Sequence, residues 1–264
     1  MLENENLVLV GQKCVLVPYL KRHVEHYNKW MQSPELLEMT ASEPLTIEEE
    51  YEMQESWRVD ENKCTFIILA RESPNQEITP ENALAQPMVG DVNLFFNDHD
   101  DPHAAEIEIM IAEPTYRRKG MGLEALRMMM TYAYQSLGTK RITAKISTEN
   151  QGSIQLFLTQ LEFVQISYSQ IFEEVTLERG LTADSNSNDA EEASTEVADQ
   201  GQESPSSSSS AAASEENGIG AVISAKKNGE GDDEDEDCLQ EPATTAFFET
   251  LELNASDLDH PRDS

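Results

Sequence analysis

Residues 106–137 constrain this chain more than any other segment, because they read as a buried strand, a basic glycine turn and a long helix. The turn is RRKGMG at residues 117–122, and the helix is expected to follow it directly. The first amides of a helix have no acceptor within the helix, and the helix dipole adds partial positive charge there. A phosphate can accept hydrogen bonds from those amides, while Gly120 and Gly122 leave the backbone open to a ligand. The turn therefore predicts a pyrophosphate site.

The negative charge of the chain narrows the choice of partners. The formal net charge is −33, and residues 184–264 hold 22 acidic and 3 basic residues. Nucleic-acid binding needs a basic face, so nucleic acid is not an expected partner. Cationic partners, such as a basic protein surface for the acidic C-terminal segment or a protonated amine substrate, are favoured. Solubility is a second reason for the same charge.

Several kinds of segment are not expected from this sequence. The N-terminus lacks the basic region and long apolar run of a signal peptide, and no stretch reaches 18 apolar residues. We therefore expect no membrane partner and a cytoplasmic protein, with the nucleus as a second location. The cysteines and histidines show no metal-ligand spacing, so no metal is expected.

Apolar periodicity over residues 7–178 predicts one α+β domain, in the order strand, two helices, three strands, helix, strand, helix and two strands. Thr46 and Glu49 form a capping-box pattern that opens the second helix. Residues 180–264 contain five consecutive serines and the run GEGDDEDED. Such a segment buries too little apolar surface to offset chain entropy, which predicts a disordered acidic low-complexity tail that contributes little to the core. Within it, AFFETLEL at residues 246–253 is either a short binding motif or a remnant of composition.

Arg117, Gly120 and Gly122 fit the pattern [QR]-x-x-G-x-[GA] after a strand, which resembles the GNAT superfamily of acetyl-CoA-dependent N-acetyltransferases. SIQLFLTQLEF at residues 153–163 is similar to a second pattern of this family, except that Glu162 replaces a glycine. Residues 7–178 are most similar to the N-acetyltransferase 9-like group, through segments such as VPYLKRHVEHYNKWM, MVGDVNLF and EIEIMIAEP. The resemblance implies the GNAT fold, a mixed and mostly antiparallel central sheet flanked by helices.

The same resemblance implies acetyl-CoA as a co-substrate, with no metal. The backbone of residues 109–112 would pair with the pantetheine arm, and the amides of residues 118–122 would hold the pyrophosphate. Asn150 either binds the pantetheine or only caps a helix, which its residue type also favours. The candidate cofactor-binding residues are Ile109, Met110, Ile111, Ala112, Arg117, Arg118, Lys119, Gly120, Met121, Gly122, Asn150, Ser153 and Phe157.

Transfer of an acetyl group to an amine needs a proton acceptor. Glu106 and Glu108 are two residues apart on a strand, so they share one face, with Met110 continuing it. A buried carboxylate costs free energy unless it has a partner or a role. The resemblance implies that Glu106, eleven residues before Arg117, is the base, with Glu108 as second choice. Either carboxylate alternatively binds a protonated substrate amine or a neighbouring cation.

Many members of the superfamily place a tyrosine, which protonates the leaving thiolate, where this chain has Phe157. Either Tyr168, another group or water must take that role here. The predicted function is an N-acetyltransferase in which an amine of a protein or peptide attacks acetyl-CoA directly in a ternary complex. The alternative is a weakly active or inactive GNAT-fold module that binds proteins, among them a cytoskeletal polymer. The sequence leaves open whether the acceptor is an α-amine or a lysine.

Overall fold

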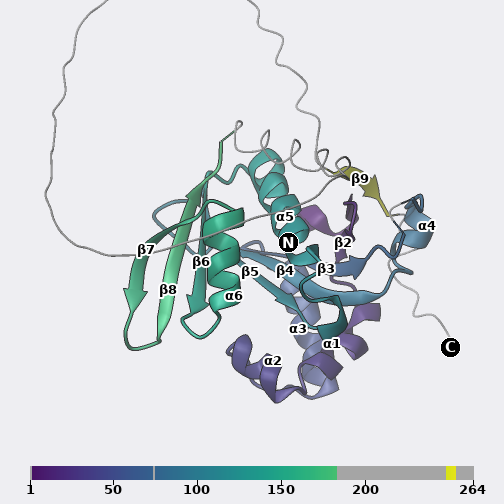
Figure 1. The fold of residues 1–264 in the computed structure, drawn as a ribbon. Helices are drawn as coiled ribbons and strands as arrows, with labels where there is room; N and C mark the ends of the chain where they lie inside the picture. The colour runs from purple at the N-terminus through teal and green to yellow at the C-terminus, as the bar shows by residue number, and fades with distance from the viewer. Residues whose placement is uncertain (1, 74, 183–247, 254–264) are drawn as a thin grey trace, which may run out of the picture. The chain divides into compact units, whose positions relative to one another are not determined.

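A computed structural model describes residues 2–73, 75–182 and 248–253, which belong to one compact unit. Their strands form one sheet in the order β7-β8-β6-β5-β4-β3-β2-β1-β9 (Figure 1). Neighbouring strands run antiparallel except β5 and β6, which are parallel. The strands are β1 Leu7–Val10, β2 Cys14–Pro18, β3 Lys63–Ala70, β4 Met88–Phe95, β5 Ala104–Ile111, β6 Arg141–Ser147, β7 Val164–Ser169, β8 Glu174–Gly180 and β9 Glu249–Glu252. This is the mixed, mostly antiparallel sheet that the sequence predicts.

Helices cover both faces of this sheet. In Figure 1, α1, α2 and α3 lie below the strands and α5 lies above them. The α-helices are α1 Val24–Trp30, α2 Pro34–Met39, α3 Ile47–Val59, α4 Pro80–Ala83, α5 Met121–Leu137 and α6 Gln151–Gln155. Short 3-10 turns are η1 Leu2–Asn4, η2 Lys21–His23 and η3 Pro114–Tyr116, and a π-helical turn, η4 Leu156–Gln160, continues α6. In the described part of the chain, no helix is long and apolar enough to span a bilayer.

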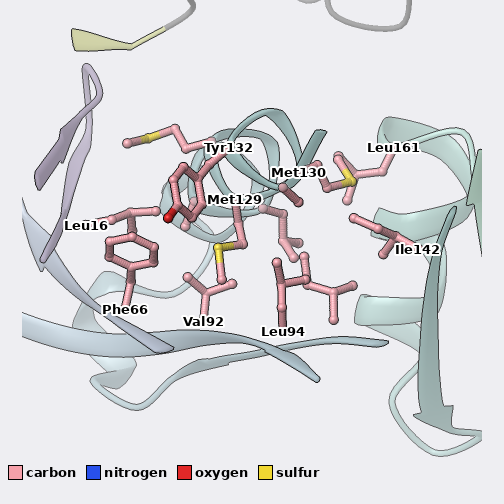
Figure 2. Packing of buried hydrophobic residues seen from close by; sticks show 14 of the residues in the cluster. Leu16, Phe66, Val92, Leu94, Met129, Met130, Tyr132, Ile142 and Leu161 are labelled. Atoms are coloured by element: carbon pink, nitrogen blue, oxygen red, sulfur yellow. The ribbon is translucent and has the colours of Figure 1, made fainter. Parts of the chain in front are cut away.

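The face toward α5 is apolar. Figure 2 shows Met129 on α5 packed close to Val92 and Leu94 of β4, with Phe66 and Tyr132 in contact beside them. The rings of Phe66 and Tyr132 meet edge to face, with centroids 5.6 Å apart. Burial of each such side chain is worth about 1.5–3 kcal/mol, so this packing fixes α5 on the sheet. The N-terminal end of α5, where the glycine turn lies, is thereby held in place.

The strand β9 corrects the prediction of an unstructured tail for residues 248–253. Its residues pair with β1 along the edge of the sheet, from Leu7 opposite Glu252 to Val10 opposite Glu249. Phe248 and Leu253, which flank the strand, are buried, the first in the cluster under α5 and the second in the cluster on the other face. Residues 250–253 (TLEL) alternate polar and apolar side chains, and so short a pattern becomes a strand only when an open sheet edge is available to pair with. At its start the predicted tail also belongs to the domain, since Gly180 ends β8 and Leu181 is buried in the core cluster. Residues 183–247 and 254–264 lie outside the described residues.

Among the other predictions of local structure, one is confirmed and two short helices were missed. The capping box of α3 forms, because the Thr46 side chain accepts a hydrogen bond from the Glu49 amide and the Glu49 carboxylate accepts one from the Thr46 amide. The short helices α2 and α4 were not predicted. Glu162, at the position of the family glycine, adopts φ 55°, a left-handed conformation that costs a residue with a Cβ roughly 1–2 kcal/mol.

Candidate active site

The glycine turn leaves several backbone amides without an acceptor. Gly120 precedes α5 with φ 82° in the left-handed region, and Arg118 has φ 62°. In the residues that the structure covers, the amides of Arg118, Lys119 and Gly120 donate no hydrogen bond to the protein. The amides of the first turn of α5 have no acceptor in the helix either. Together they form a set of neighbouring donors without acceptors in the protein, which is what a pyrophosphate site needs.

Gly122 provides a test of whether a ligand fits there. A Cβ atom built on Gly122 would lie 3.6 Å from Ile111 Cγ1 and 3.7 Å from Ile109 Cδ1, both ordinary van der Waals distances. Packing within the protein therefore does not require glycine at this position, and neither does the backbone, which has no positive φ here. A ligand that approaches the backbone closely does require it. The turn fits a bound phosphate group.

The cations of the turn have different surroundings. Arg117 points inward: its Nε donates to the Ile111 carbonyl at 2.8 Å, and its Nη1 binds Glu35 of α2 at 2.7 Å. Its role in this structure is to hold the turn against β5 and α2. Lys119 Nζ lies 5.1 Å from the centroid of the Tyr116 ring. Arg118 Nη1 lies 3.6 Å from where a Cβ on Gly152 of α6 would be, which brings the turn and α6 together.

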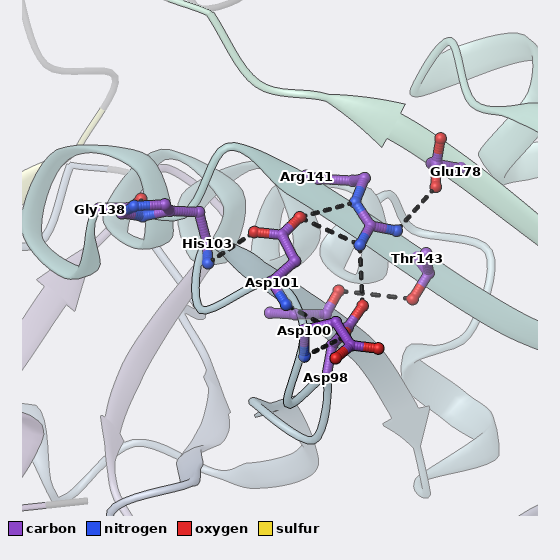
Figure 3. A network of polar contacts seen from close by, with 9 residues as sticks. Asp98, Asp100, Asp101, His103, Gly138, Arg141, Thr143 and Glu178 are labelled. Carbon is purple, nitrogen blue, oxygen red and sulfur yellow. Dashed lines mark hydrogen bonds and ion pairs between the residues drawn. The ribbon is translucent and has the colours of Figure 1, made fainter.

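The strands β5 and β6 are joined at one end only. Their pairing includes Ala104 with Arg141 and ends at Glu106 with Thr143, although both strands continue. Figure 3 shows what closes the joined end: Arg141 binds Asp98, Asp101 and Glu178 at 2.9–3.1 Å. These contacts tie the β4–β5 turn to β6 and β8 and raise the pKa of Arg141 further above its already high value. Beyond Glu106, the β6-facing edge of β5 is therefore open to an added extended chain, next to the glycine turn. Ile109–Ala112, the predicted pantetheine segment, lies on this open edge.

Glu106 and Glu108 occupy different positions relative to this opening. Both lie on the face away from α5, since Ile107 and Ile109 contact the α5 cluster and Met110 contacts the opposite one. Glu106 is at the end of the closed ladder and forms an ion pair with Lys145 of β6 at 2.6 Å. Glu108 lies one step into the open part, and water reaches its side chain. The surrounding protein still removes part of its hydration, and this, followed by the charge of Glu106, raises the pKa of Glu108 above its ordinary value.

A buried polar row lies behind the two glutamates on the same face. Thr65 Oγ1 donates to Asn93 Oδ1 and Asn93 Nδ2 donates to Asp91 Oδ2, each at 2.6 Å. Asn93 stands opposite Glu108 in the pairing of β4 with β5. Burial raises the pKa of Asp91 to about 6 and lowers that of Lys63, whose ammonium lies over the Trp57 ring, to about 8. Proton-binding groups with shifted pKa values are thus concentrated beside the open edge, as is common in active sites.

The remaining predicted residues take structural positions. Asn150 is the N-cap of α6, and its Oδ1 accepts a hydrogen bond from the Ser153 amide at 3.1 Å, so the capping interpretation holds in this structure. Phe157 is buried in the core, where its ring meets Phe163 edge to face at 4.9 Å. Tyr168 is 54% exposed on β7. In the described ranges, three or more His, Cys, Asp or Glu side chains nowhere come together as metal ligands would.

Comparison with known proteins agrees with this geometry. Residues 13–160 match the family described as "Acetyltransferase (GNAT) domain". The chain belongs to the GNAT acetyltransferase family. Over 174 residues it is 54% identical to an N-acetyltransferase 9-like protein of Nematostella vectensis, covering 66% of this chain and 86% of that relative. It is 51% identical over 174 residues to the Mus musculus protein named alpha/beta-tubulin-N-acetyltransferase 9, covering 66% of this chain and 71% of the mouse protein. The chain is thus a GNAT enzyme of the N-acetyltransferase 9-like group, as the sequence patterns predict.

Solved structures of low sequence identity share the GNAT fold. One is a spermidine N-acetyltransferase from Vibrio cholerae in complex with CoA and spermine, with a TM-score of 0.53 and 15% identity over 64% of this chain and 95% of that one. Another is RimJ from Mycobacterium smegmatis in complex with CoA-disulfide, with a TM-score of 0.52 and 14% identity over 67% of this chain and 88% of that one. At these identities the likeness concerns the fold.

Sequence reasoning missed two features that lie beside the candidate site. The first is the polar row, although MVGDVNLF carries the same period-two pattern as the glutamate strand: Asp91 and Asn93 alternate with the buried Val92 and Leu94. Residues two apart on a strand share one face, so the spacing of Asp91 and Asn93 is a signal for a polar row there. The second is Lys13, which lies about a hundred residues before the glycine turn and approaches it only through tertiary structure.

Proposed function

We propose that this protein transfers the acetyl group of acetyl-CoA to an amine of a protein, by direct attack in a ternary complex. The observation that carries the proposal is the open edge of β5 between the glycine turn and the polar face. It brings a phosphate site, an unpaired strand edge and two carboxylates together. Proximity of two bound reactants can supply much of the rate without a covalent enzyme intermediate.

Acetyl-CoA supplies the acetyl group as a thioester. The amides of residues 118–122 would bind its pyrophosphate, and the open edge of Ile109–Ala112 would align its pantetheine arm. The Ile111 carbonyl accepts a hydrogen bond from Arg117 Nε, which fixes the backbone of this part of the edge before any ligand binds. The donor side therefore depends on backbone groups fixed by the packing of α5 and by Arg117.

On the acceptor side, we assign the proton acceptor to Glu108 in preference to Glu106. Glu106 would have to leave its ion pair with Lys145 to take up a proton, whereas Glu108 faces the opening and forms no ion pair within the described residues. The raised pKa of Glu108 lies closer to neutral pH, and a general base is most effective when its pKa is near the operating pH. The thiolate is protonated by Tyr168 or by water, because Phe157 has no acidic proton and lies in the core.

The names of the mouse and human relatives favour tubulin as the acceptor protein. A tubulin acceptor would require this protein to be cytoplasmic. The acidic chain also suits an amine that arrives protonated, since negative charge steers cations toward the site. The test is acetyl transfer to a diverse peptide library that includes the N-terminal and lysine-containing peptides of α- and β-tubulin, read by mass spectrometry. Labelling of unrelated peptides in preference to the tubulin peptides would contradict this assignment.

Gly122→Glu tests the donor site. The new carboxylate would lie where the pyrophosphate binds, so we expect loss of acetyl-CoA binding in calorimetry. Gln135→Glu is the matched control, because it adds the same charge at the exposed far end of α5. Gly120→Glu should also abolish binding, but its left-handed φ adds strain that Gly122 does not have. Unchanged affinity in Gly122→Glu would remove the phosphate site from this turn.

Paired amide substitutions test the base. Glu108→Gln should lower kcat on the order of 10²-fold, with acetyl-CoA affinity nearly intact. Because the raised pKa means that the base is lost as pH falls, the variant should also lose the acidic limb of the pH–rate profile. Glu106→Gln should keep that limb. If the two variants exchange these behaviours, Glu106 is the base, as the sequence resemblance implies.

A second candidate function is protein binding without efficient transfer. Phe157 motivates it, since the family tyrosine is replaced by a core residue. Turnover distinguishes the two: a protein that binds acetyl-CoA and tubulin but acetylates no peptide of the library is a binding module.

A further inference from the structure

The turn between β1 and β2 is fixed to the first turn of α5 by one carboxylate. Glu124 is buried, and its oxygens accept three backbone hydrogen bonds: from Gln12 at 3.0 Å, Lys13 at 2.7 Å and Cys14 at 2.8 Å. Hydrogen bonds to an ionised group are about twice as strong as neutral ones, and a buried charge needs them to offset its lost hydration. This contact joins residues more than 100 positions apart in the sequence.

Gly11 makes the close approach of that turn to α5 feasible. A Cβ on Gly11 would lie 2.7 Å from Glu124 Oε2 and 2.7 Å from Met128 Sδ, closer than atoms in contact can be. The Gly11 amide closes the turn on the Cys14 carbonyl at 2.9 Å. Gly11 and Glu124 therefore act together to fix the backbone position of Lys13, two residues after Gly11.

The Lys13 side chain reaches the glycine turn. Its Nζ lies 2.7 Å from where a Cβ on Gly120 would be, directly beside the residue that precedes α5. Because the Glu124 carboxylate is occupied by backbone amides, it does not bind this ammonium group. Among the described residues, Lys13 Nζ forms no ion pair and no hydrogen bond. Its positive charge therefore lies beside the glycine turn, where the amides of residues 118–120 have no acceptor in the protein.

We propose that Lys13 binds the pyrophosphate of acetyl-CoA and that Glu124 positions it, which rests on the proposed function. The pyrophosphate is preferred over the 3′-phosphate because Nζ lies against Gly120, next to the free amides. The site would then have donors from two distant parts of the chain: backbone amides of the glycine turn and an ammonium group from the β1–β2 turn. Lys13 would thus be a binding residue and Glu124 a positioning residue.

Lys13→Ala tests the binding role by calorimetry with three ligands. Loss of one charge-assisted hydrogen bond should weaken acetyl-CoA binding roughly tenfold. The factor should be the same for acetyl-dephospho-CoA, which lacks the 3′-phosphate, and close to one for acetylpantetheine, which lacks all phosphates. Lys13→Arg should recover most of the affinity. The matched control is Lys140→Ala, an exposed lysine just beyond the far end of α5.

A loss confined to acetyl-CoA would show a 3′-phosphate contact and overturn the assignment. Equal affinities for Lys13→Ala and Lys140→Ala would overturn the binding role. In both cases wild-type protein still binds acetyl-CoA, whereas failure of the proposed function means that wild type does not bind it at all.

A double-mutant cycle tests the positioning role. If Glu124 acts through Lys13, Lys13→Ala should weaken acetyl-CoA binding much less in a Glu124→Gln background than in wild type. A merely structural role for Glu124 gives additive losses and contradicts the proposal. If Glu124→Gln does not fold, Gly11→Ala disturbs the same contact more mildly, because its Cβ would displace the Glu124 carboxylate and the Met128 sulfur, the ends of two flexible side chains. It should reduce the effect of Lys13→Ala in the same way.

Discussion

The two faces of the sheet carry different kinds of side chain. On the face toward α5, β3, β4 and β5 present apolar side chains, such as Phe66, Val92 and Ile107. On the face toward α1 and α3, the same three strands carry the polar side chains Thr65, Asn93 and Glu108 among apolar ones such as Ile67 and Met110. The first face gains free energy from burial, while the second loses part of it by desolvating polar groups. The comparison teaches that α5 and its glycine turn are held by the apolar face, so that the other face can keep proton-binding groups beside the open edge of β5.

Leu126→Ala should give the largest effect, because it opens a cavity in the apolar face. Leu126 is fully buried in the cluster under α5. Leu→Ala changes at such sites cost about 3–5 kcal/mol. Urea unfolding measures the loss, with Leu158→Ala, at a partly exposed leucine of η4, as the control. A loss below about 1 kcal/mol for Leu126→Ala would show that α5 is held by something other than this packing.

Asp91→Asn should change how stability depends on pH on the polar face. The folded-state pKa of Asp91 is raised to about 6 from 3.8, so the folded protein binds the proton more tightly than the unfolded chain. This contribution to stability is fully present below pH ~4 and is lost as pH rises through about 6, at up to roughly 3 kcal/mol. Lys63 titrates above this window.

The comparison is between unfolding free energies of wild type and Asp91→Asn at pH 4 and pH 7. Wild type should lose stability relative to the variant over this interval. The control Asp100→Asn changes an exposed carboxylate and should leave the wild-type difference in place. Parallel pH curves for wild type and Asp91→Asn would mean that this face does not bury a carboxyl group in solution.

Phe248→Ala and Leu253→Ala should give smaller effects, about 2 kcal/mol each, because an edge site collapses more easily than a central one. They test β9 on each face separately, since Phe248 packs in the α5 cluster and Leu253 in the opposite cluster. Thr250→Ala, an exposed residue of the same strand, is the control. If both large-to-small variants melt like wild type, β9 does not pair with β1 in solution, and the sequence prediction of a tail without structure is restored.

The sequence determined the features that depend on local pattern. The capping box of α3, the period-two strand that carries Glu106 and Glu108, and the glycine turn before α5 are each specified by residues within a few positions of one another. The family resemblance followed from such local patterns, and with it the sheet architecture. Asn150 shows the limit of a local pattern, since one residue type serves equally as ligand and as cap.

Tertiary structure decided everything that joins distant segments. Whether residues 249–252 form a strand depended on the free edge of β1, some 240 residues earlier. Whether Glu106 or Glu108 lies beyond the paired stretch depended on where the pairing of β5 with β6 ends, which is at Glu106 and Thr143. Lys13 lies beside the glycine turn through tertiary structure, in which Glu124 accepts a hydrogen bond from its backbone amide. Sequence periodicity reports which face a side chain takes, because backbone geometry alone fixes that. Sequence periodicity does not report which distant residue a side chain will contact, because that depends on how the whole sheet and α5 pack.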